Sequence, residues 1–199
     1  MLVALGTLAG TATRRRGGRL VGGALTALVA GPYADAVARH APYAHTRQVA
    51  VRWLVDSTWS APNTLAGALF LAHQRALDNP ERPDRSRSSG SIWLERSAVR
   101  GYATTIGIVK AGSSERIDAR EDVHVLQARL LGPLYVPLVA LDFVLATVFP
   151  FWLRHRAPPA APIRSVRDYF HRGVYREVWH ERWAYAAAPV RPTIAPRPD

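Results

Sequence analysis

The apolar run Leu130–Leu153 constrains the fold of this chain more than any other feature of its sequence. It is about as long as a helix must be to cross the hydrocarbon core of a bilayer, and Asp142 is its only charged residue. Three prolines interrupt it, at positions 133, 137 and 150. The run is therefore expected either to cross a membrane or to return on a bent path as a re-entrant hairpin, an interfacial helix pair or a buried core helix.

The charge distribution also favours a membrane. The net charge is +11, and the basic residues are arginines apart from Lys110. Four arginines precede the apolar run Leu20–Gly31, and two follow Leu130–Leu153. Cations beside apolar runs are typical of the cytoplasmic side of membrane proteins, whereas no RNA-binding, zinc-knuckle or helix-turn-helix pattern is present. We therefore expect membrane lipid as a partner, a protein complex as a further possibility, and no nucleic acid.

Composition along the chain divides it into three regions. Residues 1–45 form a basic and apolar anchor or signal-like segment, in which Ala34-Asp35-Ala36 offers small residues at the spacing of a cleavage site. Residues 46–188 are expected to form a single domain that includes the run 130–153. Residues 189–199 form a proline-rich tail that is expected to be disordered. The sequence contains no cysteine, which excludes disulfides and thiolate zinc sites.

The periodicity of the domain predicts a mainly α fold with a small β-hairpin. The runs Ser91–Glu95 and Tyr102–Lys110 alternate apolar and polar residues and indicate a hairpin or a pair of edge strands. Asp118 resembles an N-cap with Glu121 as its capping-box partner, and the helix that follows should end near Leu131. Further helices are expected over 49–76 with a break at Pro62, over 164–172 and over 175–188, with a loop over 78–90.

The passage Glu121–Arg129 (EDVHVLQAR) is the one that could carry chemistry. Glu121 and His124 lie three residues apart and Arg120 and His124 lie four apart, so each pair shares a helix face. Zincin metallopeptidases place His-Glu-x-x-His on such a helix, where the histidines bind zinc and the glutamate activates a water molecule.

The run Glu121–Pro137 (EDVHVLQARLLGPLYVP) resembles a little-characterised group of bacterial zincin-like, membrane-associated proteins. The preceding segment 104–118 (TTIGIVKAGSSERID) and the later Glu181–Tyr185 (ERWAY) are also similar to that group, so the likeness extends over about residues 102–185. The resemblance implies a zincin-like core in the bacterial inner membrane. It also implies zinc held by His124 and Glu181, with Glu121 as general base.

The chain departs from the motif at its first histidine, where it has Arg120. A guanidinium group stays protonated and offers no lone pair to a metal. The resulting hypothesis is a degenerate zincin-like core with membrane-contacting helices, which acts as a non-catalytic scaffold or complex subunit and needs no cofactor. Arg120 would then pair with Glu181 in place of the metal.

Two alternatives remain at this point. The first is an active membrane-linked zinc metallopeptidase, in which another histidine assists His124 and Glu181; His180 points elsewhere on its predicted helix, and His171 and His155 are the other candidates. The second is a two-span membrane protein in which the motif is incidental. If the run 130–153 crosses a bilayer, His124 and Glu181 must lie on opposite sides of it.

Overall fold

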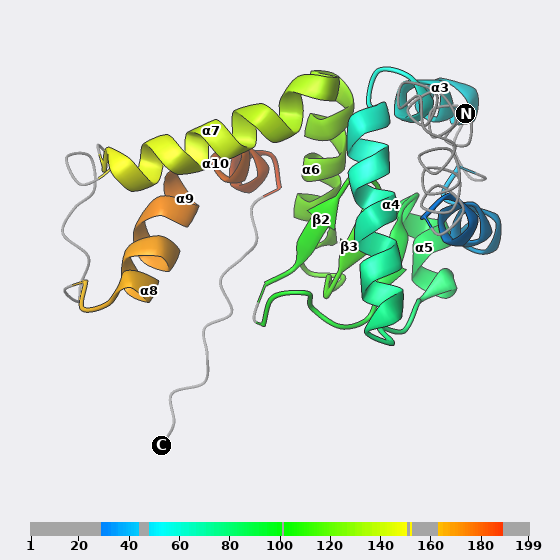
Figure 1. The fold of residues 1–199 in the computed structure, drawn as a ribbon, viewed down its shortest axis with the longest axis horizontal. Helices are drawn as coiled ribbons and strands as arrows, with labels where there is room; N and C mark the ends of the chain where they lie inside the picture. Colours follow the sequence, from blue (N-terminus) through cyan, green and yellow to red (C-terminus); the bar gives the residue numbers. More distant parts are fainter. Residues whose placement is uncertain (1–28, 44–47, 101, 151, 153–162, 189–199) are drawn as a thin grey trace, which may run out of the picture.

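The computed structural model describes residues 29–43, 48–100, 102–150, 152 and 163–188. In these ranges the chain is mainly helical, with one small mixed sheet (Figure 1). The arginine-rich start of the chain, residues 20–28 of the apolar run Leu20–Gly31 and the proline-rich tail lie outside the described residues. The mainly α prediction is confirmed for the part that is described.

The sheet contains β1 (Ile92–Leu94), β2 (Thr104–Ile106) and β3 (Val109–Ala111), in the order β1-β3-β2. β2 and β3 pair antiparallel around a tight turn at Gly107, whose φ of +58° suits glycine. β1 pairs parallel with β3. The hairpin therefore forms from the second predicted run and Ala111, and the first run joins it as a parallel strand.

The core lies between the sheet and two helices, one over residues 29–40 and the other α4 (Ala61–Ala76). Tyr33 and Ala36 of the first helix pack in the same cluster as Leu71 of α4 and Ile92 of β1. The described part of the predicted N-terminal segment therefore packs against the core. Residues 29–43 belong to the domain, and Ala34-Asp35-Ala36 lies inside a helix.

The predicted helical region 49–76 is divided as expected, into α3 (Val49–Ser57) and α4. Pro62 lies in the first turn of α4, where a missing N–H leaves no helical hydrogen bond unmade. The predicted loop over 78–90 is wrong in part, because it contains α5 (Pro83–Ser89). Pro83 starts that helix, and Gly90 ends it in the left-handed conformation.

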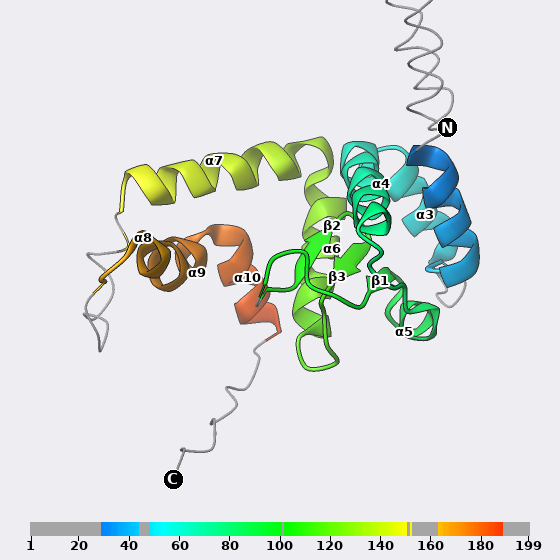
Figure 2. The same ribbon diagram turned by 60° about the horizontal axis from the view of Figure 1, so that its bottom comes forward.

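The motif helix α6 (Asp118–Leu131) has the predicted bounds but not the predicted cap. Ile117 is the N-cap, and the carboxylate of Asp118 instead accepts a hydrogen bond of 2.6 Å from Lys110, which is fully buried in β3. The turn η1 (Gly132–Leu134) follows α6 and leads into α7 (Tyr135–Val148). By length and composition, Asp118–Val148 meets the requirements for a helix that spans a bilayer. α6 and α7 nevertheless point in clearly different directions (Figures 1 and 2).

The last described part of the chain folds back beneath α7 (Figure 2). It comprises α8 (Val166–Asp168), the π-helix η3 (Tyr169–Val174), α9 (Tyr175–Glu177) and α10 (Trp179–Ala187). Val178 breaks the helix with a ψ of 134°, and α10 then packs against α6. Asp142, the only charge in the apolar run, accepts a hydrogen bond of 2.6 Å from the backbone N–H of Trp179 and so caps α10.

Candidate functional site

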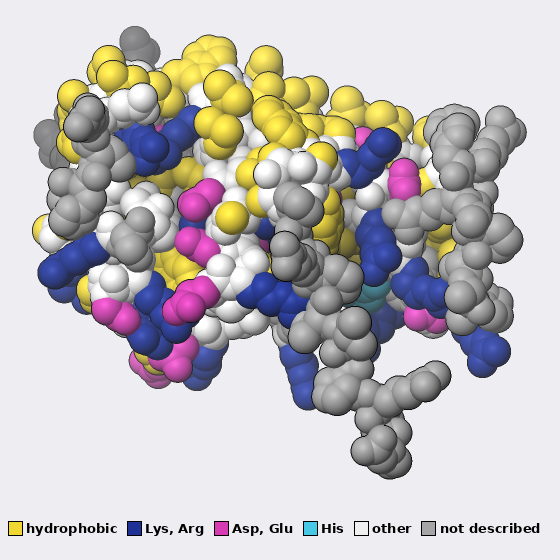
Figure 3. Space-filling model, turned by 180° about the vertical axis from the view of Figure 1, so that it is seen from behind, with side chains coloured by type: hydrophobic (Ala, Val, Ile, Leu, Met, Phe, Trp, Pro, Cys, Tyr) yellow, Lys and Arg dark blue, Asp and Glu magenta, His cyan; other side chains and the backbone are white. Residues whose placement is uncertain are grey.

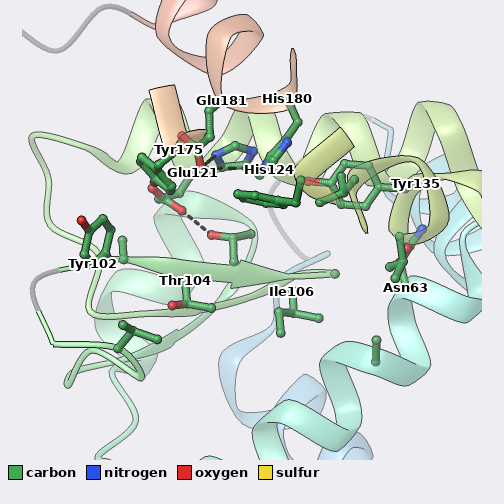
Figure 4. A pocket seen from close by; sticks show the side chains of 18 of the residues that line it. Asn63, Tyr102, Thr104, Ile106, Glu121, His124, Tyr135, Tyr175, His180 and Glu181 are labelled. Carbon is green, nitrogen blue, oxygen red and sulfur yellow. Dashed lines mark hydrogen bonds and ion pairs between the residues drawn. The ribbon is translucent and has the colours of Figure 1, made fainter. Parts of the chain in front are cut away.

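The candidate site is the seam between α6 and α10, where polar side chains are buried beside the edge strand β2 (Figure 4). Ordinarily such groups are buried only when they are paired. The polar side chains of α6 and α10 that are buried in the seam are Arg120, Glu121, His124, Gln127, His180 and Glu181.

Gln127 ties the two helices together and sets the tautomer of His124. Its Nε2 donates to the backbone carbonyl of His180 at 2.9 Å, so its Oε1 faces Nδ1 of His124 at 3.0 Å. The reverse amide orientation would place two acceptors against each other. Nδ1 of His124 therefore carries a proton, and Nε2 faces Glu181.

Glu121, the predicted general base, is held by three hydrogen bonds. Arg120 donates to its Oε1 from Nε at 3.2 Å and from Nη2 at 2.9 Å, and Thr105 of β2 donates to its Oε2 at 2.6 Å. The Glu121 side chain is almost fully buried. A carboxylate in this setting is an anchor between α6 and the sheet, and it is poorly placed to take a proton from water.

Arg120 does not form the ion pair that the sequence suggested. Its guanidinium contacts Glu121 on one side and donates to the Tyr185 hydroxyl on the other at 2.8 Å, with the Tyr185 ring beneath it. Neither of these partners of Arg120 is Glu181. The predicted pair of Arg120 with Glu181 is therefore wrong within the described residues.

Glu181 instead faces His124. Nε2 of His124 and Oε1 of Glu181 lie 3.6 Å apart. The two residues that the motif singled out as a pair do meet, although they are far apart in the sequence. They could not meet if the run between them crossed a bilayer once. In this structure the chain after α7 folds back so that α10 packs against α6.

His180 is the site residue that the sequence analysis misplaced. Its Nε2 lies 3.9 Å from Oε1 of Glu181, and its ring packs against those of His124 and Phe143. Burial, followed by the proximity of His124, lowers the pKa of His180 to about 4. Its position beside Glu181 was a signal for His180 in the sequence, but the direction of its side chain depends on the backbone break at Val178, which the sequence does not mark.

Glu181 keeps one oxygen without a partner. Its Oε2 is buried and makes no hydrogen bond to any described residue, and the same is true of Nδ1 of His180. Burial raises the pKa of Glu181, against the lowering effects of His124, Tyr175 and Arg120. These two atoms are the unsatisfied polar groups of the seam.

A cavity of about 460 Å³ lies beside the seam, between β2 and α7. Its walls are mostly apolar, and Glu121, His124, His180 and Glu181 supply its polar side (Figure 4). His171 also lines it, stacked on Tyr102 and hydrogen-bonded to the Tyr102 hydroxyl. His155 lies outside the described residues.

The seam does not fit a catalytic zinc ion. Such an ion takes three protein ligands and leaves a position open for water. Arg120 stands where the motif has its first histidine, and Glu121 is held by Arg120 and Thr105. Within the described ranges, no three His, Asp or Glu side chains are grouped so as to hold a metal ion.

Comparisons with known proteins add no family assignment, because no family profile, curated protein or solved structure matches the chain significantly.

Proposed function

We propose that this chain is a non-catalytic protein of the membrane surface, built on a degenerate zincin-like core, and that it acts as a scaffold or complex subunit. α7 provides the observation that carries the proposal. All fourteen of its residues are described, and none of them is buried. A helix that is apolar all round is normally buried in a protein or in a membrane.

The two faces of α7 differ in what they contact. One stripe is partly buried against the rest of the domain and contains Tyr135, Val139, Asp142, Phe143 and Ala146. The residues of the other face are exposed, and apart from Thr147 they are apolar. In a protein surrounded by water this outer face would carry polar residues.

The exposed face of α7 continues onto neighbouring helices. We use the name apolar band for a group of exposed apolar side chains. They follow one side of the molecule from α3 across the α6–α7 corner and along α7. They are Val51, Trp53, Leu54, Trp59, Leu130, Leu134, Leu138, Leu141, Leu145 and Val148. Figure 3 shows hydrophobic side chains along this side, with arginine side chains below them. Exposed apolar surface of this extent marks an interaction site.

A bilayer is the occupant that we propose for the apolar band. At 1.5 Å per residue α7 is about 21 Å long, shorter than the roughly 30 Å of a hydrocarbon core. The net charge of +11 favours anionic lipid headgroups. These features support a helix that lies in the interface, with the rest of the domain on one side of the membrane.

The non-catalytic part of the proposal rests on the contacts of Arg120. The arginine stands in the position of the first metal ligand and binds the carboxylate that would serve as general base. Metal analysis of the purified protein tests this part. We expect less than a tenth of a zinc ion per chain, whereas about one zinc per chain would favour the alternative of an active metallopeptidase.

Flotation with lipid vesicles tests the membrane part. We expect the chain to float with vesicles that contain anionic lipid. Leu141→Gln combined with Leu145→Gln should weaken binding by about 100-fold, because two leucine side chains leave the hydrocarbon. Leu77→Gln combined with Val166→Gln is the matched control, since both residues are exposed but lie outside the apolar band. Equal weakening by the two pairs, or no flotation of the unaltered chain, would contradict the proposal.

A further inference from the structure

On the polar side of the cavity beside the seam, some buried atoms have no hydrogen-bond partner. Glu181 and His180 are each 6% exposed, and both point into the cavity (Figure 4). Oε2 of Glu181 and Nδ1 of His180 are without hydrogen-bond partners among the described residues. A buried polar atom without a partner destabilises the fold, so such atoms usually have a ligand or ordered water to bind.

Charge defines what would bind there. The nearest guanidinium, that of Arg120, is already engaged by Glu121 and the Tyr185 hydroxyl. Oε1 of Glu181 faces His124 at 3.6 Å, and the Glu181 carboxylate lies in the wall of the cavity. An ammonium group would supply both the hydrogen bond that Oε2 lacks and a positive charge beside the buried carboxylate.

The remainder of the cavity suits a hydrocarbon chain. Apolar side chains from α7, β2 and η3 form most of its walls, among them Val139, Phe143, Ile106 and Phe170. Val136 lines the cavity and is 50% exposed on α7, so the rim of the cavity reaches the surface beside the apolar band. Its volume of about 460 Å³ is within the range of small-molecule sites.

We infer that this cavity binds an amphiphile that has a primary ammonium end and a linear aliphatic chain. The ammonium group donates to Oε2 of Glu181, and the chain lies between β2 and α7. The inference rests on the cavity and does not require that α7 lies in a membrane. A free alkylamine and an amine-bearing lipid share this chemistry.

Equilibrium dialysis of radiolabelled hexylamine tests the site. The full chain is held in nanodiscs of phosphatidylcholine, which has no primary amine, and empty nanodiscs give the background. Saturable binding of one hexylamine per chain is expected. Hexanol and hexanoate should bind at least about tenfold more weakly, because neither brings a positive charge to Glu181. Equal binding of all three would overturn the inference.

Variants then locate the site. Glu181→Gln keeps the shape of the side chain and should weaken hexylamine binding about tenfold or more, and Val139→Trp should abolish it by filling the cavity. Glu115→Gln is the matched control, because Glu115 is exposed and does not line the cavity. Unchanged binding in Glu181→Gln would refute the inference. The comparison of three ligands uses the unaltered chain, so it decides the question even if a variant does not fold.

Nanodiscs that contain increasing amounts of dioleoyl phosphatidylethanolamine distinguish a free alkylamine from an amine-bearing lipid as the natural ligand. Competition with hexylamine would assign the site to an amine-bearing lipid, and lack of competition would assign it to a free amine. Flotation of the same protein sample measures membrane attachment separately. A chain that floats but does not bind hexylamine would refute only this inference and leave the proposed function standing.

Discussion

The seam between α6 and α10 and the apolar band along α7 reverse the usual distribution of residues in a protein. In the seam, side chains such as Arg120, Glu121 and Glu181 are buried, whereas Leu141 and Leu145 in the band are more than 40% exposed. Burying charge costs free energy, and exposing hydrocarbon to water does too. Because neither arrangement is expected to stabilise an isolated domain, we propose a binding role for both regions.

The corner between these regions is held by polar contacts to backbone. Asn63 of α4 donates to the carbonyl of Ala128 at 3.0 Å and to that of Gly132 at 2.7 Å. Trp59 donates to the carbonyl of Leu130 at 3.2 Å. These bonds tie the end of α6 and the turn η1 to α4 and the residues before it, and the Ala128 carbonyl also accepts the helical hydrogen bond from the Gly132 N–H. These hydrogen bonds therefore fix the angle between α6, which carries the seam, and α7, which carries most of the apolar band.

The largest effect is expected from breaking the buried ion pair of the seam. Arg120→Ala should lower the free energy of unfolding by about 3–5 kcal/mol, because Glu121 is left buried without its cation. Urea unfolding followed by circular dichroism measures the change. Arg182→Ala is the control, since Arg182 is exposed and should contribute less than about 1 kcal/mol.

A double-mutant cycle identifies the partner of Arg120. Arg120→Ala and Glu121→Gln should be strongly coupled, because each removes the same contact. Arg120→Ala and Glu181→Gln should be closer to additive. Stronger coupling to Glu181 than to Glu121 would restore the pair that the sequence suggested and contradict the contacts described above.

Acid should destabilise the seam through His180. The pKa of His180 is lowered to about 4 from 6.5, so the unfolded chain binds a proton at a higher pH than the folded chain does. The stability that depends on neutral His180 is present above pH 6.5 and is lost as the pH falls toward 4, by roughly 3 kcal/mol. Glu181 changes the stability in the opposite direction as the pH falls. Its pKa is raised in the folded chain, so the folded chain binds this proton at a higher pH than the unfolded chain does.

Comparison of variants isolates this contribution of His180. His180→Gln should reduce the loss of stability between pH 7 and pH 4, measured as the urea midpoint at each pH. His73→Gln is the control, because His73 is exposed on α4 and does not line the cavity. An equal pH dependence in His180→Gln and in the unaltered chain would show that burial does not hold His180 neutral.

A smaller effect is expected at the corner. Gly132 has a φ of +54°, and a Cβ there would lie 2.4 Å from the ring of Trp59. Gly132→Ala should therefore destabilise the fold by about 2 kcal/mol. Gly31→Ala should instead be neutral or stabilise by up to about 1 kcal/mol, because Gly31 is helical and an added Cβ meets nothing within 4 Å. Similar melting temperatures for the two variants would contradict the role assigned to Gly132.

The sequence predicted those parts of the fold that depend on local patterns. The start of α6 was predicted from the pattern at Asp118 and its end from Gly132-Pro133, and the division between α3 and α4 was predicted from Pro62. The pairing of the strands could not be predicted from local patterns, because the parallel pairing of β1 with β3 joins two separate segments of the sequence. The capping box was predicted at Asp118 because its pattern is local, whereas buried Lys110 draws that carboxylate away.

The candidate site was predictable in its residues but not in its pairing. His124 and Glu181 meet as the motif implied. Adjacent residues on a helix do not normally face each other, yet Arg120 bends back onto Glu121 because its long side chain is buried between α6 and Tyr185. The inward position of His180 depends on the break at Val178, which no local pattern in the sequence marks.

Depth measurement along α7 tests most directly whether the apolar band lies on a membrane. Because the sequence contains no cysteine, each of Leu138→Cys, Leu141→Cys and Val148→Cys gives a single site for a fluorescent label. Quenching by lipids labelled at known depths measures how far each site lies below the surface. Leu77→Cys is the control and should remain in water.

The account predicts that the three labels on α7 lie at similar, shallow depths, roughly 5–10 Å below the headgroup boundary. A helix that crosses the membrane would instead show depths that change steadily from Leu138 to Val148, over about 15 Å. That gradient, or labels that all remain in water, would contradict the proposal that this protein works at a membrane surface.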